Sequence, residues 1–311
     1  MASHARESFL KGIRALEDLC TEPVATEASD RGGVLRRGLV VTAYNLLETF
    51  VMERTTELLR HAETGPTHFA DLSDGQKKRA LRNTLQVASR RVLRGDWDLS
   101  SLGQLAGELG ASLNQSGGLG LHPYAFLWDG SNMSPEDLRS TLRMWHVASP
   151  FEQLLILSSR LGFDTSDPLS PGQISLKEDL SALMTMRHKC AHDSSSLISG
   201  LELRAIPNRI LRVAAPFDVL ASSGAQHLRE GTREYFMNDD AVDARGIDIR
   251  VIEKRANSWA LMRKSGVAAH RVLPTAEPLV ALACSQASSH GVVVVRNLQR
   301  ELLTWTTVGC G

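Results

Sequence analysis

The sequence has little cysteine, no long apolar run and no net charge. Its four cysteines, Cys20, Cys190, Cys284 and Cys310, are scattered and form no CxxC pair, so neither a disulfide framework nor a zinc ribbon is expected. No stretch approaches the roughly 20 apolar residues that span a bilayer, and the first residues lack a charged-then-apolar leader. We therefore expect a protein of the reducing cytoplasm, neither exported nor embedded in a membrane.

The charges balance, because lysine plus arginine and aspartate plus glutamate each number 35. No overall field then attracts nucleic acid or anionic lipid, and any such contact must be local. Only seven of the basic residues are lysine and 28 are arginine, a bias that suggests a GC-rich bacterial genome. The guanidinium fork suits phosphate, but codon bias explains the ratio more simply.

The chain contains enough apolar material for a folded core. Its 311 residues are 42% apolar and 23% charged, as in ordinary soluble proteins. The length exceeds a usual domain of roughly 100–200 residues, so we expect two domains. We find no internal repeat and no low-complexity tract.

Apolar residues at steps of three and four predict a series of amphipathic helices. The clearest spans Gly38–Arg60. Further helices are expected at Gly75–Leu93, Leu99–Leu113, Pro135–Val147, Glu152–Leu161 and Asn208–Leu220. Ahead of them, residues 1–35 are expected to be a flexible lead-in with one short helix, Glu7–Leu19.

Beyond about Gly231 the pattern changes to β-branched, aromatic and alternating residues, which are typical of strands. Such segments are Ile247–Val251, Trp259–Met262, Val292–Val295 and Leu302–Val308. We expect a mainly α protein, with a helical bundle over residues 36–230 and a small β-rich (α+β) domain over 231–311. From residue 247 onward, the sequence has eight basic residues and four acidic ones. This end could contact RNA or a regulator, although such charge is ordinary for exposed strands.

One further helix is expected after Ser175, and it ends in a cluster of basic residues. After a loop over Asp164–Gly172, the residues Ser175-Leu176-Lys177-Glu178 form a capping box, in which Ser and Glu side chains satisfy free backbone N–H groups. The helix should end near Asp193. Its buried face should carry Leu176, Leu180, Leu183, Met184 and Ala191.

Near its end, Leu183–Asp193 resembles the Arg-polar-(three residues)-His signature of the HEPN superfamily. Ala43–Phe50 is similar to that family's first long helix, in which a glutamate, here Glu48, lies among large apolar residues. The likeness covers roughly residues 36 to 220. It implies a HEPN-like helical bundle with the motif near the end of a late helix.

The resemblance implies a metal-independent endoribonuclease that cuts single-stranded RNA, such as tRNA or mRNA. Attack by the ribose 2′-hydroxyl needs a proton acceptor, a proton donor and positive charge at the phosphate, and histidine and arginine supply these. Arg187 would bind the scissile phosphate and His192 would be the general base or acid. His188 would support the site, and Glu48 would hold Arg187 through a charge-assisted pair.

Residues five apart on a straight helix point about 140° away from each other, at roughly 100° per residue. Arg187 and His192 therefore do not share a face. The family resolves this with a homodimer, in which two motif helices line a common cleft. Because unregulated RNA cleavage is toxic, the resemblance further implies a bacterial toxin or antiphage effector, controlled by an antitoxin, another partner or its own second domain. The alternative is a catalytically silent module that binds a nucleotide, RNA or a protein.

The same residues permit two other interpretations. His188 and His192 are four apart and share a helical face, as in zinc-binding helices. Lys189 stands where such protease helices carry glutamate, however, and Cys190 lies off that face. We expect no metal and no cofactor. Cys190 as a nucleophile would need a lowered pKa and a base, and a small buried residue is the simpler interpretation.

Overall fold

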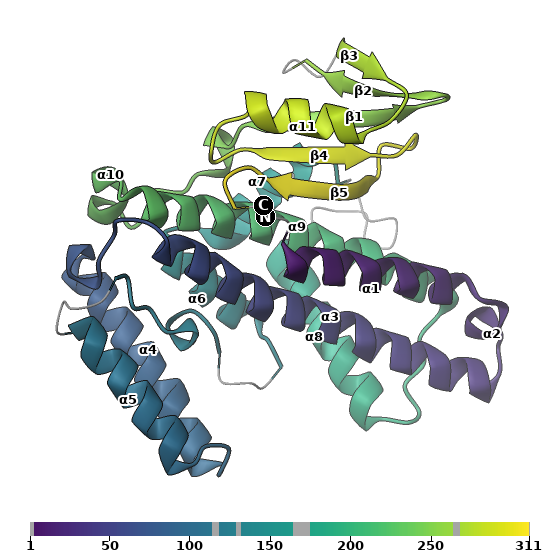
Figure 1. Cartoon of the computed structure of the whole chain (residues 1–311). Helices are drawn as coiled ribbons and strands as arrows, with labels where there is room; N and C mark the ends of the chain where they lie inside the picture. The colour runs from purple at the N-terminus through teal and green to yellow at the C-terminus, as the bar shows by residue number, and fades with distance from the viewer. Residues whose placement is uncertain (1–2, 114–117, 129–131, 164–174, 264–267, 311) are drawn as a thin grey trace.

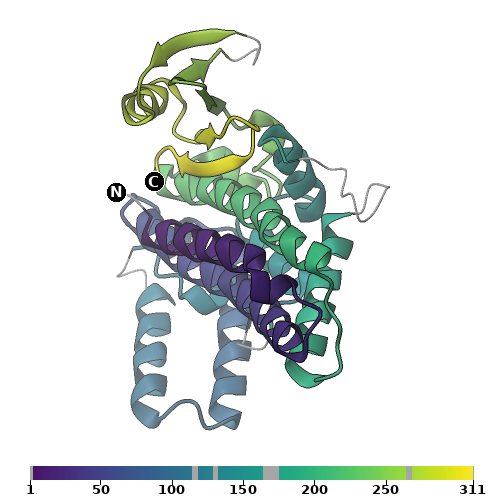
Figure 2. The same cartoon turned by 90° about the vertical axis from the view of Figure 1, so that its right-hand side faces the viewer.

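A computed structural model describes residues 3–113, 118–128, 132–163, 175–263 and 268–310. The chain is mainly helical, and a small mixed β-sheet lies near its C-terminal end (Figure 1). Both views place the sheet above a layer of long helices, with the two ends of the chain side by side between them (Figures 1 and 2). The loop expected over Asp164–Gly172 lies outside the described residues.

Most of the longer helices begin where a side chain caps the backbone. They are α1 (His4–Thr21), α2 (Pro23–Thr26), α3 (Asp30–Glu63), α4 (Asp74–Leu93), α5 (Leu99–Leu113), α6 (Pro135–Met144), α7 (Pro150–Arg160), α8 (Leu176–His192), α9 (Gly200–Glu230) and α10 (Arg233–Met237). Capping boxes start at Ser73, Ser134, Ser175 and Ser199, where the hydroxyl accepts from the backbone N–H three residues on and that residue's side chain accepts in return. The helices predicted between Gly75 and Leu161 are confirmed within a few residues at each end.

The prediction that residues 1–35 form a flexible lead-in is wrong for the described residues of this segment. The short helix predicted there is present as α1, but it packs into the core, and Phe9 stacks on Phe50 of α3 with ring centroids 4.5 Å apart. Its start is fixed by Glu57, whose carboxylate accepts from the Ser3 hydroxyl at 2.6 Å and the Ala5 backbone N–H at 2.8 Å. These contacts join residues more than fifty positions apart, which local pattern does not reveal.

Two long helices, α3 and α9, lie against each other at the centre of the molecule, and α1 and α8 pack on them. α9 is longer than the predicted Asn208–Leu220 and continues through Pro207 and Pro216. It is buried on nearly all sides between Ile210 and Gln226. It ends at Gly231, whose φ of 66° is the left-handed conformation that commonly terminates helices.

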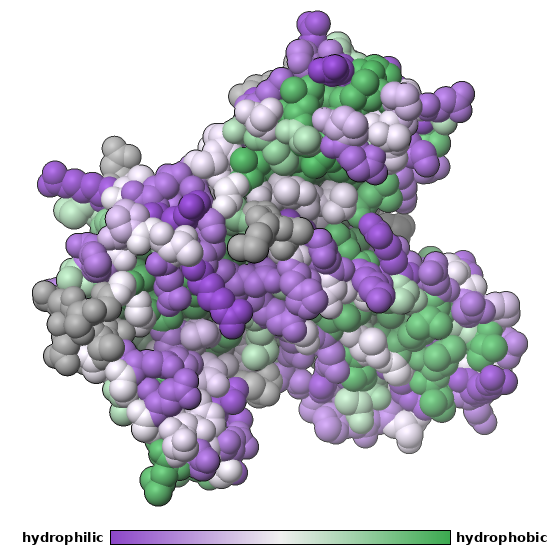
Figure 3. Space-filling model, in the orientation of Figure 1, coloured by the Kyte–Doolittle hydropathy of each residue, from purple (hydrophilic) through white to green (hydrophobic). Residues whose placement is uncertain are grey.

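Helices α4 and α5 form an arm that extends away from the rest of the molecule (Figures 1 and 2). Leu93 and Leu99 flank the connection between them and are 83% and 87% exposed. Exposed leucines therefore lie near the end of the arm, where Figure 3 shows a small green area beside hydrophilic residues.

The sheet has the strand order β3-β2-β1-β4-β5. Its elements are β1 (Ile249–Arg255), β2 (Ser258–Met262), β3 (Ala269–Leu273), α11 (Glu277–Gln286), β4 (Val292–Arg296) and β5 (Leu302–Thr307). β1 and β4 are parallel, and the other neighbours are antiparallel. The parallel pair requires a crossover connection, which α11 provides. The strand segments predicted around residues 249, 259, 292 and 302 are confirmed, whereas β3 and α11 were not predicted.

Strand β4 lies between two apolar layers. Successive side chains of a strand point to opposite faces, so Val292 and Val294 join the core of the helical part, whereas Val293 and Val295 pack with Leu279 and Ala283 of α11. The sheet is thus continuous with the helical core on one face and covered by its own helix on the other.

A buried ionic network also joins the two parts. Asp218 of α9 accepts from Nε of Arg6 at 2.8 Å, Nε of Arg54 at 2.6 Å and Nε1 of Trp305 at 2.7 Å. The same two arginines donate to Thr307 of β5. The carboxylate is completely buried, so this network links α1, α3, α9 and β5 at one point.

Among the residues described, we find no helix with both the length and the apolar character needed to cross a bilayer.

Candidate functional site

Helix α8 carries the predicted motif and is fixed to its neighbours by its buried face. Leu176, Leu180 and Leu183 are buried as expected, and Met184 is half-buried. Asp179 is also buried and accepts from Nε of Arg209 on α9 at 2.7 Å. The prediction for Ala191 is wrong, because it is exposed and Cys190 is buried in its place. Cys190 comes seven residues after Leu183, so it continues the same buried face of the helix.

Arg187 lies half-buried on the side of α8 that faces α3. Its charge acts on Glu48 and Tyr44, since it lowers the pKa of both groups against the larger effect of burial, which raises them. Nε of Arg187 is buried and has no hydrogen-bond partner among the described residues. Arg187 therefore lies in the helical layer with no hydrogen-bond partner for its Nε in the described part of the chain.

Glu48 does not form the predicted ion pair with Arg187 within the described part of the chain. Its carboxylate accepts instead from the backbone N–H of Met133, while the Tyr44 hydroxyl donates to the Met133 carbonyl. Tyr44 and Glu48 are four residues apart on α3, so they hold the two polar groups of Met133 from one helical face. Glu48 acts on Arg187 only through the electrostatic interaction described above.

His188 and His192 lie together on the outer face of α8. Their ring centroids are 4.6 Å apart, and both side chains are exposed. Within one chain, the structure brings these two imidazoles together but forms no direct contact between Arg187 and His192. The backbone N–H of Asp193 then closes the helix by donating to the carbonyl of Lys189 at 2.8 Å.

A groove of about 610 Å³ runs beside the motif, on the side of α8 that faces the start of α9. Its lining includes Thr185 and Lys189 of α8 and Glu202 of α9. Leu197 lines its rim and is 87% exposed, and nearby Leu201 is 61% exposed. The end of the motif helix thus lies next to an exposed apolar edge.

Cys190 lacks the properties of a nucleophile. Its side chain is buried, and that burial raises the pKa of its thiol. A reactive cysteine needs the opposite shift, because the thiolate is the nucleophile. The structure therefore favours the structural interpretation of this residue.

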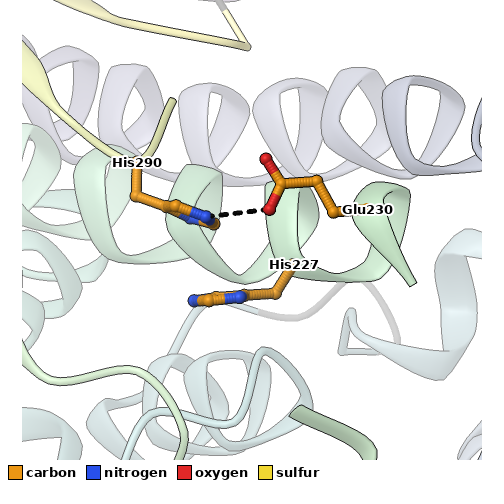
Figure 4. A group of neighbouring side chains, drawn as sticks. All are labelled: His227, Glu230 and His290. Carbon is orange, nitrogen blue, oxygen red and sulfur yellow. Dashed lines mark hydrogen bonds and ion pairs between the residues drawn. The ribbon is translucent and has the colours of Figure 1, made fainter. Parts of the chain in front are cut away.

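The structure also brings together three residues that the sequence analysis did not identify: His227 and Glu230 on α9, and His290 in the turn before β4. One ligand atom from each lies within 4.8 Å of the others. Nε2 of His290 is 3.1 Å from Oε2 of Glu230, and the two imidazole rings are stacked with centroids 4.0 Å apart (Figure 4). Burial, with a smaller effect of His290, lowers the pKa of His227 to about 4.

The spacing of His227 and Glu230, three apart on one helix, was the available signal for this cluster. It is weak without the third member, which is 60 residues from Glu230 in the sequence. Only the packing of the sheet against α9 brings His290 into reach.

Comparison of the chain with protein-family models, with curated proteins and with solved structures found no match.

Proposed function

We propose that the chain is a metal-independent endoribonuclease of the HEPN type, whose active site forms where the α8 helices of two protomers meet. One observation carries the proposal. The last turns of α8 carry Arg187, whose Nε has no hydrogen-bond partner among the described residues, and the exposed imidazoles of His188 and His192. These are the groups that cleavage by a ribose hydroxyl requires.

In the proposed reaction, His192 of one protomer accepts the proton of the ribose 2′-hydroxyl. The 2′-oxygen attacks the adjacent phosphorus, and the bond from phosphorus to the 5′-oxygen breaks. The protonated His192 of the second protomer donates its proton to that leaving oxygen. Arg187 stabilises the charge that develops on the phosphoryl oxygens. The products are a 2′,3′-cyclic phosphate and a 5′-hydroxyl.

The geometry supports the dimeric form of this site in two ways. Arg187 is half-buried on the α3 side and His192 is on the outer face, so one chain does not supply both groups to one phosphodiester. Leu197 and Leu201 add exposed apolar area beside the motif, and apolar surface of this kind is common at protein interfaces.

The deciding experiment incubates labelled single-stranded RNA with the protein in EDTA. We expect cleavage by the wild type, products that end in a 2′,3′-cyclic phosphate, and a loss of at least about 100-fold in rate in Arg187→Ala and in His192→Ala. His270→Ala, which changes an exposed histidine of β3, should cleave normally. RNA that is bound but left whole would favour the silent binding module, and RNA neither bound nor cut would overturn the proposal.

The dimer is tested separately by sedimentation. Leu197→Glu places a charge on the apolar edge and should yield monomers that do not cleave RNA, with α8 otherwise unchanged. A monomer that still cleaves at the wild-type rate would contradict the composite site.

A further inference from the structure

We propose that His227, Glu230 and His290 bind a zinc ion that joins the end of α9 to the turn before β4. The three side chains come from two segments that only the folded chain brings together, and their ligand atoms lie within 4.8 Å of one another. Figure 4 shows His290 and Glu230 pointing toward each other, with the His227 ring next to them. This site is separate from the motif on α8.

Two imidazole nitrogens and one carboxylate oxygen form a ligand set that suits zinc. Zn²⁺ binds histidine nitrogen at about 2.0–2.1 Å and carboxylate oxygen at about 2.0–2.2 Å, usually with tetrahedral geometry. Ligand atoms then lie a little over 3 Å apart, close to the 3.1 Å between His290 Nε2 and Glu230 Oε2. The three residues leave the fourth position for water.

The polar atoms that would not touch the metal already have partners. Nδ1 of His227 lies 3.2 Å from the Thr232 hydroxyl, and Nδ1 of His290 lies 3.5 Å from the Ser223 hydroxyl. Oε1 of Glu230 accepts from Gln226 at 2.8 Å and from Ser289 at 2.9 Å. Metal-binding residues typically have such outer hydrogen bonds, which orient each ligand and fix the histidine tautomer. This leaves three atoms to coordinate the ion: Nε2 of His290 and Oε2 of Glu230, which are already 3.1 Å apart, and Nε2 of His227.

Zinc binding requires one change of geometry. The two imidazole rings are stacked with an angle of 28° between their planes, whereas a shared metal ion must lie near the plane of each ring. The His227 ring, which also stacks on Tyr235 at 5.4 Å, must therefore rotate about its side-chain bonds. Zinc binding therefore separates the His227 ring from both His290 and Tyr235, a change that binding elsewhere would not cause.

The expected consequence is stabilisation of the contact between α9 and the sheet. Zinc that binds only the folded state stabilises it by mass action, and this site ties α9 to the turn that leads into β4. The effect does not depend on the RNA-cleavage proposal, because no residue of the α8 motif takes part.

In the first test, the metal-free chain is titrated with Zn²⁺ alone, and the heat of binding is measured by calorimetry. We expect one ion per chain in the wild type and at least about 10-fold weaker binding in Glu230→Gln and His290→Ala. The matched control is His270→Ala, which should bind as the wild type does. Unchanged affinity in both ligand variants would overturn the proposal.

The exposed pair of His188 and His192 is the competing place for a zinc ion. The double variant His188→Ala, His192→Ala should keep the stoichiometry of one. If this variant loses the ion and His290→Ala keeps it, zinc belongs to α8 and the proposed site is refuted.

The second test uses Co²⁺, which takes similar ligands and absorbs visible light most strongly when four-coordinate. We expect the absorption band of a four-coordinate nitrogen and oxygen site in the wild type and its loss in His290→Ala. Zinc should also raise the midpoint of thermal unfolding of the wild type and leave that of His290→Ala unchanged. No cobalt band and no thermal shift in the wild type would contradict the proposal, whether or not the protein cleaves RNA.

Discussion

Replacing Asp218 with asparagine tests the buried network that joins the helices to the sheet. The carboxylate accepts four hydrogen bonds, from Arg6, Arg54, Ser222 and Trp305. An amide keeps only one accepting oxygen, so about half of these donors lose their acceptor, at about 1–3 kcal/mol for each buried group. Asp218→Asn also leaves two buried guanidinium groups, Arg6 and Arg54, for which Glu57 is the remaining carboxylate among the described residues; Glu57 forms an ion pair with Arg54.

From these losses we expect the free energy of unfolding to fall by about 3–5 kcal/mol, the usual effect of breaking a buried ion pair. This is a large part of the roughly 5–15 kcal/mol that stabilises a typical protein. The assay is urea denaturation followed by circular dichroism. The matched control is Asp240→Asn, because Asp240 also pairs with an arginine but is 55% exposed, and its loss should cost at most about 1 kcal/mol.

The double variant Arg6→Met, Asp218→Asn adds a second check. Removing one guanidinium removes an uncompensated buried charge, so the double variant should be less destabilised than the two single changes predict together. If Asp218→Asn were as stable as Asp240→Asn, or if the two changes were additive, the network would not hold the two parts together as we argue.

Acid provides an independent test of the same network. Burial raises the pKa of Asp218, but Arg54 and Arg6 outweigh it and hold the pKa well below its usual range. For such a carboxylate, the stabilisation is fully present above the unfolded pKa of about 3.9 and is lost as the pH falls through the folded value. Below about pH 4, the stability of the wild type should therefore fall more steeply with acid than that of Asp218→Asn. Parallel curves would refute this.

Three further predictions follow from the packing around α9 and α3. Gly224→Ala should lower the free energy of unfolding by about 1–3 kcal/mol, because the new Cβ would lie 2.7 Å from the carbonyl oxygen of Trp145. The control is Gly200→Ala, whose Cβ would have no atom within 4 Å. Equal urea midpoints for the two variants would contradict the argument. Burial lowers the pKa of His146, so the unfolded chain binds more protons than the folded one and stability should fall as the pH drops below about 6.5. The urea midpoints at pH 7.5 and pH 5.5 should therefore differ less in His146→Asn than in the wild type. An equal difference in both proteins would exclude this residue as the cause. Tyr44→Phe removes the donor to the Met133 carbonyl and should lower the free energy of unfolding by about 1–3 kcal/mol in the same assay, whereas no loss would show that the hydroxyl is dispensable.

Features that local physical chemistry decides were predicted from the sequence. Capping boxes and three- and four-residue periodicity place α4 to α8 within a few residues, because these signals act within one helical turn. α9 was predicted too short: the expected helix, Asn208–Leu220, already included Pro216 but began only after Pro207, whereas α9 starts at Gly200 and ends at Glu230. The extensive apolar packing of α9 offsets the cost of these prolines, because most helical stability in proteins comes from tertiary packing.

The missed elements lack a local signal. β3 is an edge strand whose side chains are mostly exposed, so it shows no apolar alternation. The packing of α1 depends on contacts with residues about fifty positions away. The same distinction applies to the candidate sites. The candidate residues on α8 were chosen from the sequence alone. The hydrogen bond from Met133 to Glu48 and the contact of His290 with Glu230 of α9 arise from tertiary packing.

The hydrogen bonds of Arg6 and Arg54 to Thr307 of β5 and to Cys310 just after it limit the order in which the fold can be completed. Arg54 donates to the carbonyl of Cys310 at 2.9 Å, and Arg6 donates to Thr307 at 2.8 Å. While the ribosome is still translating, the N-terminal helices emerge long before these acceptors exist. The two guanidinium groups therefore gain their full set of acceptors only once Thr307 has been synthesised, so the buried network is completed after the helices that hold Arg6, Arg54 and Asp218 have been made.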